Sequence, residues 1–146
     1  MDKFKVTGDG RILYVKDADG LLYSSDLDGQ YETLLSGQYK VNQFQAVDEE
    51  VFYTVLQEDG WTYRLYKAEG SGKAPEAVSE GAFSSVQFAG RQILAQTPGN
   101  MPTLNIYDAQ GKLLTRIAGK AESLFTDEEM LLLKLEDEPS LKVFQF

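Results

Sequence analysis

The chain has 146 residues, of which 42% are hydrophobic, 12% aromatic and 25% charged, as in a folded domain with a real core. Acidic residues outnumber basic ones 23 to 14 and give a net charge of −9, which opposes binding to a phosphate backbone, so we expect no nucleic-acid partner. The absence of Cys and His excludes disulfides, Cys/His zinc sites, thiol nucleophiles and His-based catalytic triads.

Four successive segments of the chain repeat one order of short strands and turns. The first repeat, residues 4–40, predicts strands at 4–6, 12–15, around Leu22-Tyr23 and at 31–35. The second, residues 41–84, predicts strands at 41–46, 51–54, around Leu65-Tyr66 and at 75–78. The third, residues 85–122, predicts strands at 85–88, 93–96, around Ile106-Tyr107 and at 113–117. The fourth, residues 123–146, predicts strands at 123–125, 130–133 and around Val143-Phe144, with no outer strand.

Two independent markers support this repeat. The second strands begin 39, 42 and 37 residues apart, and the aromatic residues of the third strands lie 43, 41 and 37 residues apart. Four short strands in about 40 residues are typical of a β-propeller blade. A four-stranded meander has two apolar faces and buries both only when blades stack. We therefore predict one all-β, propeller-like domain over residues 1–146, with about four blades of four antiparallel strands and the last blade missing its outer strand.

The third strand of the first repeat and its turn carry a family resemblance. Residues 22–29 run from an apolar–aromatic pair into the turn Leu27-Asp28-Gly29, which resembles the YWTD repeat of lipoprotein-receptor-type β-propellers and of bacterial propeller-like domains of unknown function. The later repeats keep the aromatic pair with Gly72 and Gly111. The resemblance implies a propeller and, with it, a binding role. Receptor propellers of this type have more than four blades and usually disulfide-bearing neighbours, and this chain has neither.

Four residues in two loops are candidate binding residues. Asp17 and Asp19, followed by Gly20, resemble the start of a calcium loop, but a strand occupies the place of the required bidentate acid. We therefore expect a hairpin turn and no metal site. Trp61, with Tyr63 beside it, lies in a predicted loop, where an exposed Trp favours contact with a partner. Packing between blades is nevertheless the favoured explanation for Trp61, and contact with a partner is the alternative.

Other candidate chemistry has a structural explanation. The tyrosines of the second and third strands are expected to pack between blades; they are Tyr14, Tyr23, Tyr53, Tyr66 and Tyr107. The acidic clusters 48–50 and 127–129 could supply a pair of catalytic carboxylates, as in glycosidases. They also occupy equivalent turns of two repeats, which already explains both. We expect no catalytic residue and no cofactor.

Three functions remain open. The first is a non-catalytic binding or interaction module that presents its loops to a protein or a glycan. The second is a structural half-propeller, completed by a partner domain or by a second copy in a homodimer of about eight blades. The third is a carboxylate-based, glycoside hydrolase-like propeller. The chain begins without an apolar signal segment and has no apolar run that could span a bilayer. We expect a soluble domain of undetermined compartment, with a lean towards a bacterial extracytoplasmic domain whose signal or anchor lies outside this chain.

Overall fold

A computed structural model describes residues 3–68, 75–126, 130–136 and 138–145. Within them the chain forms fifteen β-strands and no helix. Sheet 1 contains β1 (Lys3–Val6), β2 (Arg11–Val15), β3 (Leu22–Asp26) and β4 (Thr33–Leu34). Sheet 2 contains β5 (Gln43–Val47), β6 (Glu50–Leu56), β7 (Tyr63–Lys67) and β8 (Glu76–Ala77). Sheet 3 contains β9 (Ser85–Ala89), β10 (Gln92–Gln96), β11 (Thr103–Tyr107) and β12 (Leu113–Ala118). Sheet 4 contains β13 (Ala121–Thr126), β14 (Met130–Leu135) and β15 (Leu141–Gln145).

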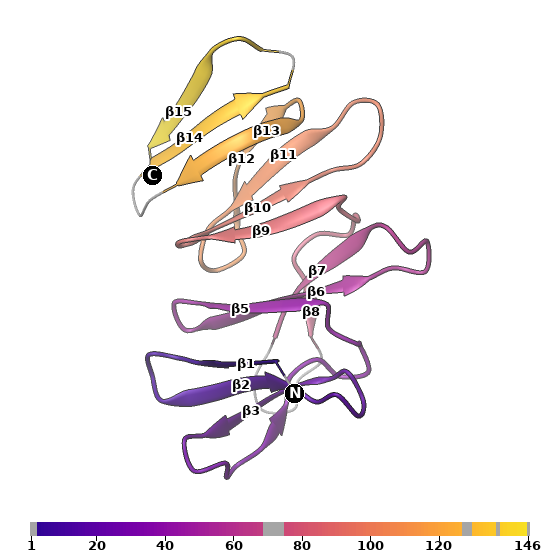
Figure 1. Cartoon of the computed structure of the whole chain (residues 1–146), viewed down its shortest axis with the longest axis vertical. Helices are drawn as coiled ribbons and strands as arrows, with labels where there is room; N and C mark the ends of the chain where they lie inside the picture. Colours follow the sequence, from indigo (N-terminus) through magenta and orange to yellow (C-terminus); the bar gives the residue numbers. More distant parts are fainter. Residues whose placement is uncertain (1–2, 69–74, 127–129, 137, 146) are drawn as a thin grey trace.

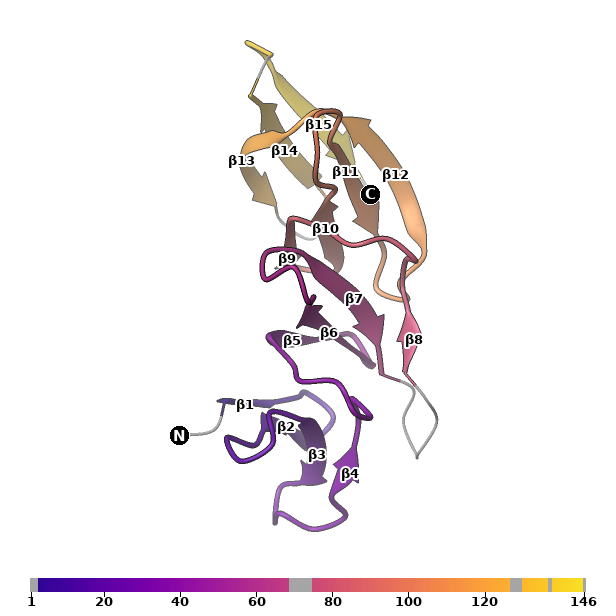
Figure 2. The same ribbon diagram turned by 90° about the vertical axis from the view of Figure 1, so that its right-hand side faces the viewer.

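Each sheet is an antiparallel meander in which strands that follow one another in the chain are hydrogen-bonded neighbours. The predicted all-β class, with four antiparallel sheets of which the last has three strands, is therefore confirmed in the described residues. The sheets follow one another in chain order along the long axis of the molecule (Figure 1). They do not close into a ring, and sheets 1 and 4 lie at opposite ends of the stack in both views (Figure 2).

The core lies between the sheets and not within any one of them. Three buried clusters occupy the three contacts between successive sheets. The cluster between sheets 1 and 2 includes Leu13, Leu22 and Tyr53, and the next includes Phe52 and Ile93. Neighbouring residues of one strand, such as Phe52 and Tyr53, thus belong to different clusters, because successive side chains of a strand point to opposite faces.

The fourth repeat is offset by one residue from the predicted alignment. The sequence pattern aligns Met130 with Ile93, whose side chain faces the preceding sheet. In the structure Leu131 and Leu133 face sheet 3 and are buried there, whereas Met130 is half-buried. Leu131 pairs with Phe144 as Ile93 pairs with Tyr107. The apolar run 130–133 does not alternate, so it could not show which of its residues face the core.

The predicted turn chemistry recurs with the same hydrogen bonds. Asp26 accepts backbone N–H groups from residues 28 and 30, and Asp108 accepts those of residues 110 and 112. Gly111 has φ +86°, and a Cβ atom there would lie 3.1 Å from Phe52 of sheet 2, so glycine suits both the turn and the contact between sheets. Gly72, the corresponding prediction in the second repeat, lies outside the described residues.

Candidate end-face interface and polar hollows

The outer face of sheet 1 carries a row of apolar side chains that no other sheet of the described residues covers. Phe4 pairs with Tyr14, Tyr14 with Tyr23, and Tyr23 with Leu34, so the four residues share one face across all four strands. The Tyr14 and Tyr23 rings are stacked, with centroids 5.9 Å apart. Phe4 is 58% exposed, and Val6, two residues further along the same face, is 61% exposed. We call this surface the N-terminal end face.

The same row of residues recurs one sheet later, where it is buried. In sheet 2 Phe44 pairs with Tyr53, Tyr53 with Tyr66, and Tyr66 with Ala77. The Tyr53 and Tyr66 rings are stacked with centroids 5.5 Å apart, and Tyr53 has no exposed surface. This row forms the sheet 2 side of the contact with sheet 1. The N-terminal end face is therefore a contact face between sheets that lacks its neighbouring sheet.

A polar rim binds the hydroxyl groups of this face, and its lysine lies over one of the two rings. The Tyr14 hydroxyl donates a hydrogen bond to Glu32, and the Tyr23 hydroxyl donates to Asp19 over 2.6 Å. Lys16 pairs with Glu32 at 2.8 Å, and its ammonium lies 4.2 Å from the centroid of the Tyr23 ring. Desolvation and the Glu32 carboxylate raise the pKa of Tyr14 to about 12. The hydrogen bond from Tyr23 lowers the pKa of Asp19.

The outer face of sheet 4 forms the opposite end of the stack. Leu132 pairs with Val143 and Lys134 with Leu141, which places these four residues on the side of the sheet away from Leu131 and Leu133. Leu141 and Val143 are 62% and 57% exposed. Lys134 forms an ion pair with Glu122. We call this surface the C-terminal end face.

Of the four sequence-predicted binding residues, Asp17 and Asp19 lie in the loop between β2 and β3, Trp61 lies in the loop between β6 and β7, and Tyr63 is the first residue of β7. Asp19 accepts the backbone N–H of Leu21 as well as the Tyr23 hydroxyl, so it is both a turn residue and part of the rim of the N-terminal end face. Asp17 is an exposed residue of the same turn. Trp61 is 58% exposed, so the favoured expectation that it packs between blades is wrong, and its backbone N–H donates to Asp59. Among the residues that the structure describes, no group of three or more acidic side chains is placed to hold a metal ion.

Tyr63 is half-buried and lines a polar hollow between sheets 2 and 3. The hollow has a volume of about 250 Å³ and is also lined by Asn42, Gln43, Thr54, Ser84, Ser85 and Val86. Thr54 is 1% exposed, and its hydroxyl has no hydrogen-bond partner among the described residues. Gln43 crosses between the sheets, where its amide donates to the carbonyl oxygen of Val86 over 2.9 Å.

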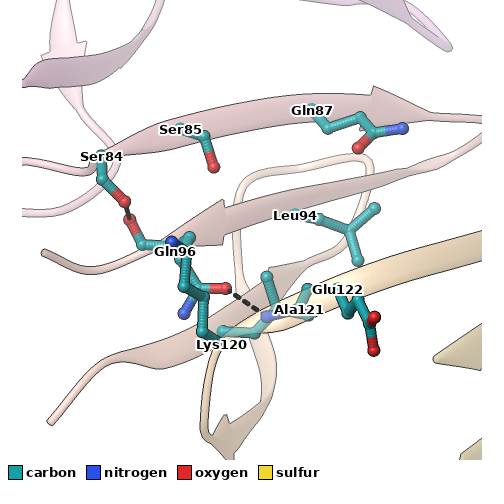
Figure 3. A pocket seen from close by; sticks show the side chains of 9 residues that line it. Ser84, Ser85, Gln87, Leu94, Gln96, Lys120, Ala121 and Glu122 are labelled. Carbon is teal, nitrogen blue, oxygen red and sulfur yellow. Dashed lines mark hydrogen bonds between the residues drawn. The ribbon is translucent and has the colours of Figure 1, made fainter. Parts of the chain in front are cut away.

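A second hollow, of about 530 Å³, lies on the other side of Ser84 and Ser85, between sheets 3 and 4 (Figure 3). Gln96 spans its wall: its amide nitrogen donates to the carbonyl of Gly119, and its amide oxygen accepts the N–H of Ala121. Leu94 lies beside these groups, and Lys120 and Glu122 contribute the charges of the lining. No pattern in the sequence indicated either hollow, because each depends on how two sheets are spaced.

The structure describes only one of the two acidic clusters. Asp48 occupies the turn between β5 and β6 with φ 53°, and its carboxylate binds Arg91 of the equivalent turn in sheet 3, with a shortest N–O distance of 2.9 Å. Residues 127–129, the second cluster, lie outside the described residues. The part of the chain that the structure describes contains no helix long and apolar enough to cross a bilayer.

Comparison with known proteins supports the fold alone. No family model matches the chain, and no curated protein matches it. The resemblance to YWTD repeats therefore stays a prediction. Among solved structures the chain is similar to a computationally designed protein, Ika8, with a TM-score of 0.51 and 17% sequence identity. The match covers 97% of this chain and 44% of Ika8, so the chain spans less than half the length of that protein.

Proposed function

We propose that the protein is a non-catalytic interaction module whose N-terminal end face binds a further β-sheet. The observation that carries this proposal is the repeated row: Phe4, Tyr14 and Tyr23 occupy the positions at which Phe44, Tyr53 and Tyr66 contact a neighbouring sheet. Burial of exposed side chains such as Phe4 and Val6 favours association by about 1.5–3 kcal/mol for each side chain fully buried.

The occupant of this face is a sheet with branched aliphatic side chains. Within the chain, the partner of the row in sheet 2 is the inner face of sheet 1, which presents Leu13, Val15 and Leu22. Sheets pack face to face about 10 Å apart when their side chains interdigitate. The rim hydroxyls are already hydrogen-bonded to Glu32 and Asp19, so an apolar sheet can cover the rings without leaving those hydroxyls unpaired.

Light scattering at tens of micromolar tests this function. We expect a species heavier than the 16.3 kDa monomer, which Val6→Lys converts to the monomer because the new ammonium would lie within the apolar contact. Met101→Lys is the matched control, because Met101 is 90% exposed in a loop of sheet 3. An unchanged mass in the Val6→Lys variant, or a monomeric parent chain, would overturn the proposal.

The unpartnered Thr54 hydroxyl favours a second candidate function, the binding of a neutral, hydroxyl-rich ligand such as a glycan in the smaller hollow. Hydroxyl and amide groups line this hollow, and the aromatic Tyr63 stands beside them. A ligand hydroxyl placed there would supply the hydrogen bond that Thr54 lacks among the described residues.

Calorimetric titration with a panel of neutral trisaccharides tests this second function. We expect at least one sugar to bind, and Thr54→Val, which keeps the shape and removes the hydroxyl, to weaken that binding about tenfold. Thr115→Val on the outer strand β12 is the control and should leave the affinity unchanged. If no sugar binds, or if Thr54→Val binds as well as the parent chain, the hollow is not a glycan site.

A further inference from the structure

We infer that the sheet on the N-terminal end face is sheet 4 of a second copy of this chain, so that two molecules join head to tail. This inference rests on the proposed interaction function and names its partner. The contacts inside the chain are all of one kind: the face of a sheet that looks towards the C-terminal end of the stack meets the opposite face of the next sheet. A head-to-tail pair makes the same kind of contact between two chains.

Each sheet has a forward-looking face, by which we mean the face that points towards the C-terminal end of the stack. The C-terminal end face is the forward-looking face of sheet 4. In sheet 3 the forward-looking pair is Leu94 with Ile106, which is buried against sheet 4. The pair at the corresponding register of sheet 4 is Leu132 with Val143, where no sheet follows in the described structure. Inside the chain, each contact joins the forward-looking face of one sheet to the opposite face of the next. Each molecule therefore has one uncovered face of each kind, one at either end.

The charges of the two end faces permit this approach. Copies of a chain with net charge −9 repel one another over their whole surfaces. On the end faces the cations are paired locally: Lys16 binds Glu32 on one, and Lys134 binds Glu122 on the other. Two N-terminal end faces would instead bring two rims containing Asp19 and Glu32 together. The head-to-tail arrangement avoids that repulsion between like rims.

A stable dimer needs contacts at both ends of the molecule, because one end face is small. Four strands about 4.8 Å apart give a face only about 19 Å wide, which is small for a stable interface. When two copies join at both ends, they bury two such contacts about one two-fold axis and leave no end face free. Contacts of this kind form a ring if the rotation closes and a growing stack if it does not.

Site-specific crosslinking tests the arrangement, because the chain has no cysteine of its own. Val6→Cys labels the N-terminal end face, and Val143→Cys labels the C-terminal end face; both valines are mostly exposed, so both variants should fold. A short bismaleimide is added to each variant alone and to their equimolar mixture. We expect a covalent dimer in the mixture at least tenfold above the level in either variant alone. Met101→Cys mixed with Val143→Cys is the control and should give no such dimer.

The outcomes separate this inference from the proposed function. A dimer in Val6→Cys alone would show that two N-terminal end faces meet, which overturns the inference and keeps the interaction function. A dimer in Val143→Cys alone would show pairing through sheet 4 or its edge strand β15, which also overturns the inference. If no mixture crosslinks and Val6→Lys leaves the mass unchanged, both proposals fail. Loss of association in Leu132→Lys as well as Val6→Lys would support both.

Discussion

Two stacked tyrosine pairs, built by the same repeat, have opposite surroundings. Tyr53 and Tyr66 lie in the core between sheets 1 and 2, whereas Tyr14 and Tyr23 lie on an end face that no sheet in the described part of the chain covers. Their positions in the strands and their cross-strand pairing are equivalent. The repeat therefore determines the chemistry of the face, and the number of sheets on either side determines whether that face is core or interface.

Removal of one ring from each pair should give the largest difference in the free energy of unfolding. Tyr53→Ala leaves a cavity in a buried contact and should lower the free energy of unfolding by about 3–5 kcal/mol. Tyr14→Ala removes a half-buried ring and should cost about 1–2 kcal/mol when measured in the Val6→Lys background, where the end face is uncovered. Urea unfolding of both variants measures the difference. Equal losses would mean that the two faces are equally covered in solution.

Alkaline pH should act on both pairs through their hydroxyl groups. Burial raises the pKa of Tyr53, and desolvation together with Glu32 raises that of Tyr14 to about 12, against an ordinary value near 10. The unfolded chain thus releases these protons at lower pH than the folded chain does. The stability they contribute is complete below about pH 10 and declines as pH rises through the folded values. We expect the melting temperature to fall by several degrees between about pH 9 and pH 11.5, and to fall less in Tyr53→Phe.

Removal of the hydroxyl groups alone should change the free energy of unfolding differently at the two sites. The buried Tyr53 hydroxyl has no hydrogen-bond partner among the described residues, so Tyr53→Phe should leave the free energy of unfolding unchanged or raise it by about 1 kcal/mol. Tyr14→Phe loses the hydrogen bond to Glu32 and should lower it by about 0.5–1.5 kcal/mol. Chemical denaturation measures both changes, and changes of opposite sign would support the view that the Tyr53 hydroxyl is unpartnered and the Tyr14 hydroxyl is bonded. A clear loss of stability in Tyr53→Phe would show that the Tyr53 hydroxyl has a partner.

Calcium should have the smallest effect. The Asp19 carboxylate already accepts hydrogen bonds from Leu21 and Tyr23, and no metal-binding group of acidic residues is present in the described part of the chain. Millimolar calcium should therefore shift the melting temperature by less than about 1 °C, because little binding free energy couples to folding. A rise of several degrees, absent in an Asp17→Asn variant, would show that the turn binds the ion.

The sequence supported detailed prediction wherever neighbouring residues control the structure. Strand positions follow from alternation and turn residues: Gly29 and Gly111 both take positive φ, and Asp26 and Asp108 organise their turns in the same way. Packing between blades was the favoured interpretation of Trp61, but the side chain is 58% exposed. The one-residue offset at Met130 arose where alternation was missing. Tyr14 and Tyr23 were predicted as packing residues, but the sequence did not indicate that their face has no neighbouring sheet in this chain.

By itself, the sequence determined that this protein is a series of four β-meanders with apolar faces, because strand period, turn chemistry and repeat length are local properties. Only the tertiary structure decided which faces meet, since every sheet carries two apolar faces and the pattern along a strand does not say what lies opposite. The open ends of the stack, the hollows beside Ser84 and Ser85, and the place of Asp19 on the rim of the N-terminal end face all depend on how one sheet is set against the next.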